Sequence, residues 1–274
     1  MSIRFALNRT CAPHLPLGDF IALATSVGVR AVEIRNDIEG REFHDGTPAE
    51  EVRSRLLDAG LEVASVNALQ RFNEWSPTRA KEAEAIISYA AALGAPGVVL
   101  CPVHNEDNGW TAAEAEKNLR DGLRQLRPIL LDHGVTGYVE PLGMKGSTMK
   151  RQDMAVAAVG DIDGWDAYQL CYDTFQFFRC GDTALMPERI GLAHMSGIAR
   201  TDLAPAALTE PDRGLIFVGD RVGNITQLRA LKATGYGGFV SMEPFNPEVQ
   251  NDPDLAAHLR ASLDYVSALL NASD

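Results

Sequence analysis

The chain has 274 residues, of which 46% are hydrophobic, so it is long enough for a large core and lies within the size range of α/β barrels that fold as one domain. The formal net charge of −12 argues against a nucleic-acid partner, because phosphate binding requires a basic surface. No segment approaches the roughly 20 apolar residues of a membrane span, and the N-terminus does not resemble a signal peptide. With four cysteines that show no CxxC spacing, these features predict a cytoplasmic protein with reduced thiols.

Short apolar segments alternate with amphipathic ones along the chain. The apolar segments predict β-strands at residues 3–8, 30–35, 62–67, 97–101, 136–140, 168–173, 190–194 and 239–243. The other segments predict helices at residues 17–27, 48–59, 77–93, 111–133, 153–159, 182–187, 224–233 and 255–270. Thr111 and Glu114 form a capping-box pattern, and Thr47 before Pro48 predicts another N-cap. Residues 196–222 show no periodicity and have the length of a loop that could act as a lid.

The repeated strand–helix order predicts right-handed parallel crossovers. Eight such units in this length favour a (β/α)₈ TIM barrel, with residues 1–274 forming one domain. Glycine-rich loops of the GxGxxG or GxxxxGK[ST] type do not occur in the sequence, which weakens a nucleotide-binding interpretation.

Two of the predicted strands end in the same unusual way. The sequence VTGYVEPLG at residues 135–143 places Glu140 between an apolar run and a proline, and GFVSMEPF at residues 238–245 does the same with Glu243. A carboxylate at the edge of an apolar core costs free energy unless it is paired, protonated or bound to a cation. We therefore expect both carboxylates to point into a common site.

Metal-ligand residue types occupy the ends of the last four predicted strands, namely Glu140, Asp173, His194 and Glu243. In an α/β barrel these ends meet at the face that carries the active site. Three carboxylates and one imidazole suit one divalent ion; the oxygen-rich set favours Mn²⁺, with Zn²⁺, Mg²⁺ and Co²⁺ as alternatives. The competing interpretation is structural: Asp173 as a helix N-cap, His194 as a core histidine, and the glutamates as loop caps paired with arginines.

These strand ends, together with the motifs EPLG, YDTFQF, HMSG, GDRVGN and SMEPF, resemble the xylose-isomerase-like TIM barrels, and within them the inosose (2-keto-myo-inositol) isomerases. The resemblance extends to NALQRFN at residues 67–73 and LCPVHN at residues 100–105. It implies that the four strand-end residues bind one divalent metal and that Glu140 and Glu243 form the acid/base pair. The implied reaction converts 2-keto-myo-inositol to 1-keto-chiro-inositol through an enediol, in inositol catabolism.

The candidate substrate-binding residues are Arg200, Gln176, Gln70, His104 and Asp220. Arg200 lies six residues after His194, where related ketose epimerases carry a substrate-binding arginine; Gln70, His104 and Asp220 are loop residues that could also contact the ligand. The same epimerases have a histidine where this chain has Gln176, and a glutamate where it has Gly146. Both departures weaken the epimerase interpretation. The histidines that a type IV AP endonuclease would need are also missing from the sequence.

The sequence leaves several functions open. An inosose dehydratase, a hydroxypyruvate isomerase or a ketose epimerase could use the same metal site, and a non-catalytic sugar-binding barrel is a further alternative. The expected partner is a small polyol ketone. Homo-oligomer formation is not decided by the sequence.

Overall fold

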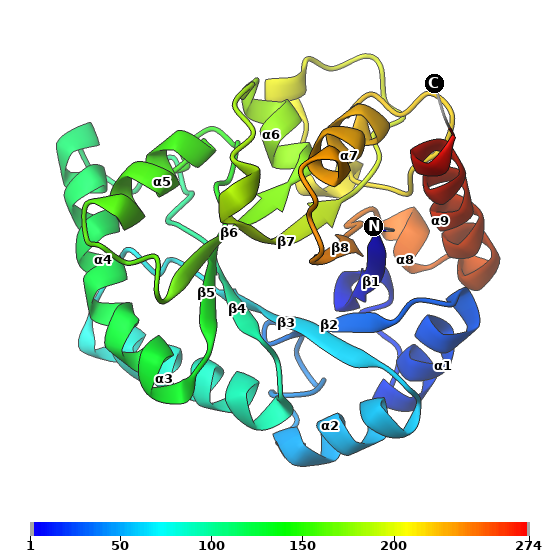
Figure 1. Cartoon of the computed structure of the whole chain (residues 1–274), viewed down its shortest axis with the longest axis horizontal. Helices are drawn as coiled ribbons and strands as arrows, with labels where there is room; N and C mark the ends of the chain where they lie inside the picture. The colour runs from blue at the N-terminus through cyan, green and yellow to red at the C-terminus, as the bar shows by residue number, and fades with distance from the viewer. Residues whose placement is uncertain (1–2, 273–274) are drawn as a thin grey trace.

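The computed structural model describes residues 3–272 and contains a closed barrel of eight parallel strands in sequential order (Figure 1). The predicted (β/α)₈ fold is therefore confirmed. The strands are β1 Arg4–Asn8, β2 Ala31–Arg35, β3 Glu62–Leu69, β4 Gly97–Leu100, β5 Thr136–Val139, β6 Tyr168–Asp173, β7 Ile190–Met195 and β8 Phe239–Met242. The helices are α1 Leu17–Val27, α2 Ala49–Asp58, α3 Pro77–Leu93, α4 Ala112–His133, α5 Gln152–Gly160, α6 Thr174–Cys180, α7 Asn224–Ala233, α8 Pro247–Gln250 and α9 Leu255–Asn271.

Two apolar cores stabilise the barrel. The larger one fills the space between the strands and the surrounding ring of helices, which Figure 1 shows around the sheet. The smaller one fills the barrel itself and joins Ala6 and Ala31 to Val99, Tyr138 and Phe239. Small residues on β1 and β2 leave room for the aromatic rings from β5 and β8, so the interior is packed rather than open. The barrel therefore offers space for a ligand only at its ends.

Local capping interactions explain most helix boundaries. The predicted capping box of α4 is present: Thr111 Oγ1 accepts a hydrogen bond from Glu114 N at 3.2 Å, and Glu114 Oε2 accepts one from Thr111 N at 2.7 Å. The predicted Thr47 cap of α2 is wrong, because Pro48 is the N-cap residue and makes no side-chain cap hydrogen bond. The Thr47 amide instead donates to Asp45 Oδ1 at 2.8 Å, in a turn before the helix.

The helix predicted at residues 182–187 is also wrong. Helix α6 lies earlier and starts directly after β6, because Asp173 Oδ1 accepts hydrogen bonds from the amides of Phe175 and Gln176 at 2.8 and 3.3 Å. It ends at Gly181, whose φ of 68° is left-handed. The side chain of Asp182 then caps the Thr183 amide at 2.8 Å, which stabilises a turn instead of a helix.

The long segment at residues 196–222 folds back over the carboxyl end of the barrel in an irregular path with two 3₁₀ turns, Pro205–Ala207 and Glu210–Asp212. Two backbone hydrogen bonds of 2.8 Å join Gly197 to Gly214 in an antiparallel bridge. This bridge closes the base of the loop and places the residues just before Gly214 at the mouth of the barrel.

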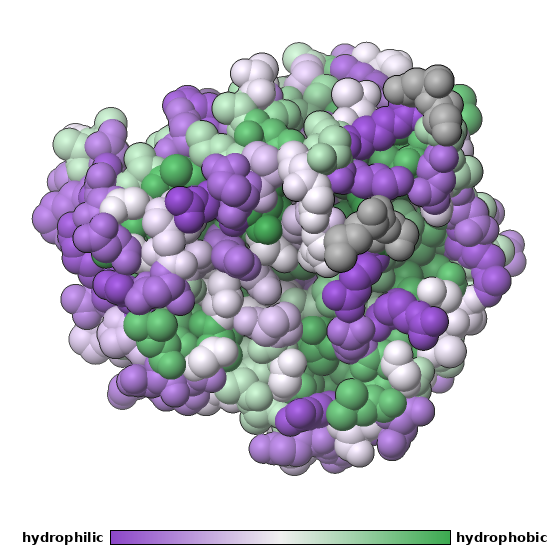
Figure 2. All heavy atoms as spheres, viewed as in Figure 1, coloured by the Kyte–Doolittle hydropathy of each residue, from purple (hydrophilic) through white to green (hydrophobic). Residues whose placement is uncertain are grey.

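The surface in view is mainly hydrophilic (Figure 2). Figure 2 shows hydrophilic side chains over much of the outer helices on the face in view, with hydrophobic side chains in scattered groups. None of the helices among residues 3–272 is both long and apolar enough to span a membrane. Cys11, Cys101, Cys171 and Cys180 are all free thiols, and the first three are buried.

Candidate metal centre and ligand cavity

The four metal-ligand candidates predicted from the strand ends come together in one buried cluster. Glu140 follows β5, Asp173 ends β6, His194 lies in β7 and Glu243 follows β8. Each offers one ligand atom, and these atoms all lie within 4.8 Å of one another. All four side chains are buried. The convergence follows from the register, in which Asp173 lies opposite His194 on neighbouring strands.

The residues present fit a divalent cation. The donor atoms are three carboxylate oxygens and one imidazole nitrogen. They lie close enough together to bind the same ion and form a mixed oxygen and nitrogen donor set. Several buried acids this close together repel one another unless a positive charge lies between them. A divalent ion would supply that charge, so the cluster has both the donors and the electrostatic need for a metal.

The electrostatics of the cluster reflect its burial. Burial raises the pKa of Glu243 to about 7; His194 and Arg213 oppose this shift, and Glu140 adds to it. Burial likewise raises the pKa of Asp173, against the attraction of Arg213. Burial alone would lower the pKa of His194, but the surrounding acidic groups hold it well above its usual range. A bound cation would favour the ionised carboxylates and compete with the proton on the imidazole.

Two buried arginines neutralise part of the negative charge. Arg213, from the long loop, donates from Nη2 to Asp173 Oδ2 at 2.7 Å and to Glu243 Oε2 at 2.9 Å, and from Nη1 to Glu210 Oε2 at 2.8 Å. Arg35, at the end of β2, donates from Nη1 to Glu243 Oε1 at 3.1 Å. Its other nitrogens bind Asp37 at 2.7 and 2.5 Å. Both guanidinium groups are therefore already paired with carboxylates of the chain.

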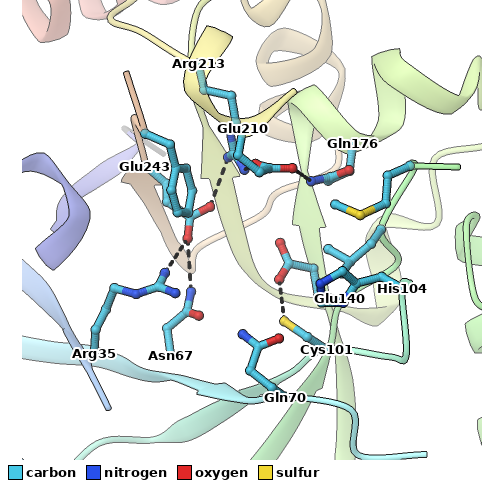
Figure 3. A pocket seen from close by; sticks show the side chains of 13 residues that line it. Arg35, Asn67, Gln70, Cys101, His104, Glu140, Gln176, Glu210, Arg213 and Glu243 are labelled. Carbon is cyan, nitrogen blue, oxygen red and sulfur yellow. Dashed lines mark hydrogen bonds and ion pairs between the residues drawn. The ribbon is translucent and has the colours of Figure 1, made fainter. Parts of the chain in front are cut away.

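A small cavity of about 140 Å³ opens beside the cluster at the carboxyl end of the barrel. Figure 3 shows Glu243 with Arg35 and Asn67 on one side of this cavity, and Glu140 with Cys101 and His104 on the other. Its remaining lining combines amides and apolar side chains: Gln70, Leu142, Met144, Gln176 and Phe245, with Glu210 and Arg213 at the rim. Neutral hydrogen-bonding groups and two opposed carboxylates suit a small hydroxylated ligand.

Three of the predicted substrate-binding residues line the cavity. Gln176 is held in place, since its Oε1 accepts from Gly143 N at 2.9 Å and its Nε2 donates to Glu210 Oε1 at 3.2 Å. His104 directs Nδ1 toward the Pro102 carbonyl oxygen at 3.1 Å, and because a carbonyl oxygen only accepts, Nδ1 carries a proton. Gln70 lies across the cavity from Glu243 in Figure 3.

The other two predicted contacts do not reach the cavity. Arg200 lies on the outer surface of the loop, where its side chain is 50% exposed and pairs with Asp202 at 2.8 Å and Asp212 at 3.2 Å. Asp220 is a turn residue: its Oδ1 accepts from the amides of Ile198 and Val222 at 3.0 and 3.1 Å. Arg200 does not line this cavity, because fixed spacing from His194 does not determine the path of a long loop. Its role in substrate binding stays a prediction.

Several residues of the site were missed from the sequence. Arg35 and Asn67 end two predicted strands, so applying the strand-end criterion to strands two and three would have identified them. Glu33 is a charged residue within an apolar strand and is fully buried beside His194. Arg213 has no local signal, because the Gly197–Gly214 bridge brings it to the site.

Fold and site together define a TIM barrel with a buried candidate metal centre at the carboxyl ends of its strands. The family described as "Xylose isomerase-like TIM barrel" matches residues 21–266, and the chain belongs to this family. This confirms the resemblance found in the sequence.

Similar proteins share the fold over nearly the whole chain. An inosose isomerase from Halalkalibacterium halodurans is 27% identical over 231 residues, covering 81% of this chain and 80% of the relative. A xylose isomerase domain containing protein from Salmonella typhimurium LT2 superposes with a TM-score of 0.88 at 26% identity, covering 99% of this chain and 100% of the other. The IolI protein with a bound zinc atom gives a TM-score of 0.86 at 22% identity, covering 98% of this chain and 100% of the other.

Proposed function

We propose that the protein is a metal-dependent isomerase that moves the carbonyl group of a keto-inositol to the neighbouring carbon, converting 2-keto-myo-inositol to 1-keto-chiro-inositol. The observation that carries this proposal is the buried set of four ligands next to a small cavity, with Glu140 and Glu243 on its two sides (Figure 3). The similarity to an inosose isomerase supports the isomerase class and the choice of substrate.

The chain's own residues can perform the required proton transfers. Moving a carbonyl to the next carbon requires that a carboxylate take the α proton while the C–H electrons form the enediolate double bond. A proton is then returned to the former carbonyl carbon. The adjacent hydroxyl passes its proton to the former carbonyl oxygen and becomes the new carbonyl. A bound divalent metal would supply the positive charge that stabilises the enediolate oxygens.

Glu140 and Glu243 have suitable surroundings for this acid/base role. Glu140 lines the cavity, and the hydrogen bond that its Oε2 accepts within residues 3–272 is a weak S–H contact from Cys101 at 3.4 Å. Glu243 is oriented by several donors, and its raised pKa of about 7 suits a group that exchanges protons near neutral pH. The two groups therefore suit the acid/base pair that the family resemblance implies.

We propose that the metal is Mn²⁺, because three of the four donors are carboxylate oxygens. Zn²⁺, Mg²⁺ and Co²⁺ are alternatives with the same donors. The zinc atom bound to the structurally similar IolI protein favours testing Zn²⁺ beside Mn²⁺.

The charges around the cavity favour a neutral substrate. Arg35 and Arg213, which line it, are both paired with carboxylates of the chain, so an anionic ligand would have to displace these carboxylates to pair with either arginine. Hydroxypyruvate carries a carboxylate that would have to compete for these arginines, whereas a keto-inositol presents only hydroxyl and carbonyl groups. Amides such as Gln70 and Gln176 can bind such groups.

The ketose epimerase alternative fits the site less well. Related epimerases carry a glutamate at the position of Gly146. Here that glycine has a φ of 86°, and a Cβ atom added to it would lie 2.7 Å from Glu106 N. The backbone of this chain therefore does not accommodate the epimerase glutamate at that point.

The experiment that tests the proposal is incubation of metal-loaded protein with 2-keto-myo-inositol in D₂O, followed by NMR and mass spectrometry. A ketone at a new ring position, with composition unchanged apart from deuterium, is the expected result. Loss of water would identify a dehydratase instead. Absence of any change with the metal bound would rule out the keto-inositol substrate.

A further inference from the structure

Glu33 lies directly behind the histidine of the candidate metal centre. Both side chains are fully buried, and His194 Nε2 lies 3.1 Å from Glu33 Oε2. The other ring nitrogen, Nδ1, faces the ligand cluster, at 3.2 Å from Glu140 Oε1 and 3.3 Å from Glu243 Oε2. The imidazole thus has one nitrogen directed at the metal centre and one at Glu33.

The position of Glu33 is itself fixed by two polar neighbours. Ser65 Oγ donates to Glu33 Oε2 at 2.5 Å, and Asn8 Nδ2 donates to Glu33 Oε1 at 3.1 Å. The orientation of the Asn8 amide is determined in turn, because its Oδ1 accepts from Thr10 N at 3.0 Å. The pairing of Asn8 with Glu33 and of Glu33 with Ser65 in the strand register brings these three residues together.

A neutral imidazole binds a cation through the nitrogen that lacks a proton. Two tautomers of His194 are available, and only the one protonated at Nε2 presents a lone pair from Nδ1 to the cluster. A carboxylate beside Nε2 accepts a hydrogen bond from the Nε2–H group and so favours this tautomer. It also increases the basicity of the ring toward a metal.

We propose that Glu33 is a positioning residue that holds His194 in the Nε2-protonated tautomer and so raises the affinity of the site for a divalent metal. The inference rests on the proposed metal-dependent function. Glu33 is not at a strand end and is not part of any motif used in the sequence analysis.

The test compares Co²⁺ binding by the wild type, Glu33→Gln and the control Glu42→Gln. Glu42 is an equally buried carboxylate that pairs with Arg9 at 3.1 Å, away from the cavity, so the control removes a buried charge without touching the cluster. We expect Glu33→Gln to weaken Co²⁺ affinity by about 10–100-fold and to change the Co²⁺ absorption spectrum. Glu42→Gln should alter neither, whatever its effect on stability.

The outcomes separate the two proposals. If the wild type fails to bind Co²⁺, Mn²⁺ or Zn²⁺, the metal-dependent function itself is wrong. If the wild type binds and Glu33→Gln binds equally well, the role of Glu33 is wrong while the function stands.

A second measurement does not require Glu33→Gln to fold. In the Zn²⁺-loaded wild type labelled with ¹⁵N-histidine, the His194 signals, assigned by loss in His194→Gln, should show a protonated Nε2 and a metal-bound Nδ1. A proton on Nδ1 would overturn the inference.

Discussion

Glu243 has the densest set of polar contacts in the site. Its Oε1 accepts hydrogen bonds from Asn8, Arg35 and Asn67, each at 3.1 Å, while Oε2 faces Arg213 and His194. These donors come from strands on both sides of β8 and from the long loop. The carboxylate is therefore fixed in orientation, as positioning for chemistry requires.

Replacing this carboxylate tests catalysis against simple binding. Glu243→Gln keeps the shape of the side chain but removes its ability to exchange a proton, so turnover should fall by about 10²–10⁴-fold while the fold is retained. The measurement is the steady-state rate together with ligand affinity from calorimetry. The exposed Glu248→Gln serves as control. A variant with undiminished turnover would remove Glu243 from the mechanism.

The sequence spacing predicts Arg200 at the ligand site, whereas the structure places Arg213 there. Arg200→Ala removes a half-exposed surface side chain and should change kcat/KM and stability little, by roughly 0.5 kcal/mol at most. Arg213→Ala leaves Asp173, Glu210 and Glu243 without their buried partner and should cost about 3–5 kcal/mol of unfolding free energy. Denaturant unfolding measures the stability of both variants, and steady-state kinetics measure their kcat/KM. A larger loss for Arg200→Ala would contradict the structure.

At the scale of elements, local sequence patterns were sufficient to predict most of the strands and helices. All eight strands and most helices follow from periodicity and caps that lie within a few residues of each other. Helix α6 was not predicted from the sequence, because it has only seven residues and shows little periodicity. Its start also depends on Asp173, which belongs to the candidate metal cluster. The N-cap role of Asp173, one of the two interpretations offered from the sequence, is therefore confirmed, and its role as a metal ligand stays a prediction.

The candidate site was predictable to the extent that barrel topology alone determines it. Strand ends must converge, and so Glu140, Asp173, His194 and Glu243 could be grouped before any coordinates were known. The position of Arg213 depends instead on a contact between distant loop residues. Sequence periodicity carries no information about such a contact.

The bridge at the base of the loop gives a matched pair of variants. A Cβ atom at residue 197 would lie 2.2 Å from Leu215 O, whereas one at residue 214 would have no neighbour closer than 3.9 Å. Gly197→Ala should therefore displace the loop with Arg213, costing about 1–3 kcal/mol and lowering kcat/KM by about 100-fold. Gly214→Ala should be close to wild type in both measurements. Equal effects of the two would show that the bridge does not position Arg213.

At the scale of the whole molecule, the buried carboxylates predict that metal binding would stabilise the fold. A ligand present at about 100 times its Kd stabilises the native state by about 2.7 kcal/mol. Removal of the metal should therefore lower the melting temperature by about 5–10 °C for a chain of this size. Calorimetry before and after chelation measures the shift, and readdition of Mn²⁺ should reverse it. His194→Gln should show a smaller shift, and a chelator-insensitive wild type would contradict the metal assignment.

The paired arginines also determine how a substrate reaches the site. A ligand without charge experiences no long-range attraction or repulsion from a molecule of net charge −12, and the carboxylates beside Arg35 and Arg213 cancel the field of these side chains near the cavity. The rate at which a neutral substrate associates with the protein then depends on diffusion and on the complementarity of its shape to the cavity. The KM for a keto-inositol should stay nearly constant between low and high ionic strength, whereas an anionic substrate would bind more readily as added salt screens the protein's negative charge.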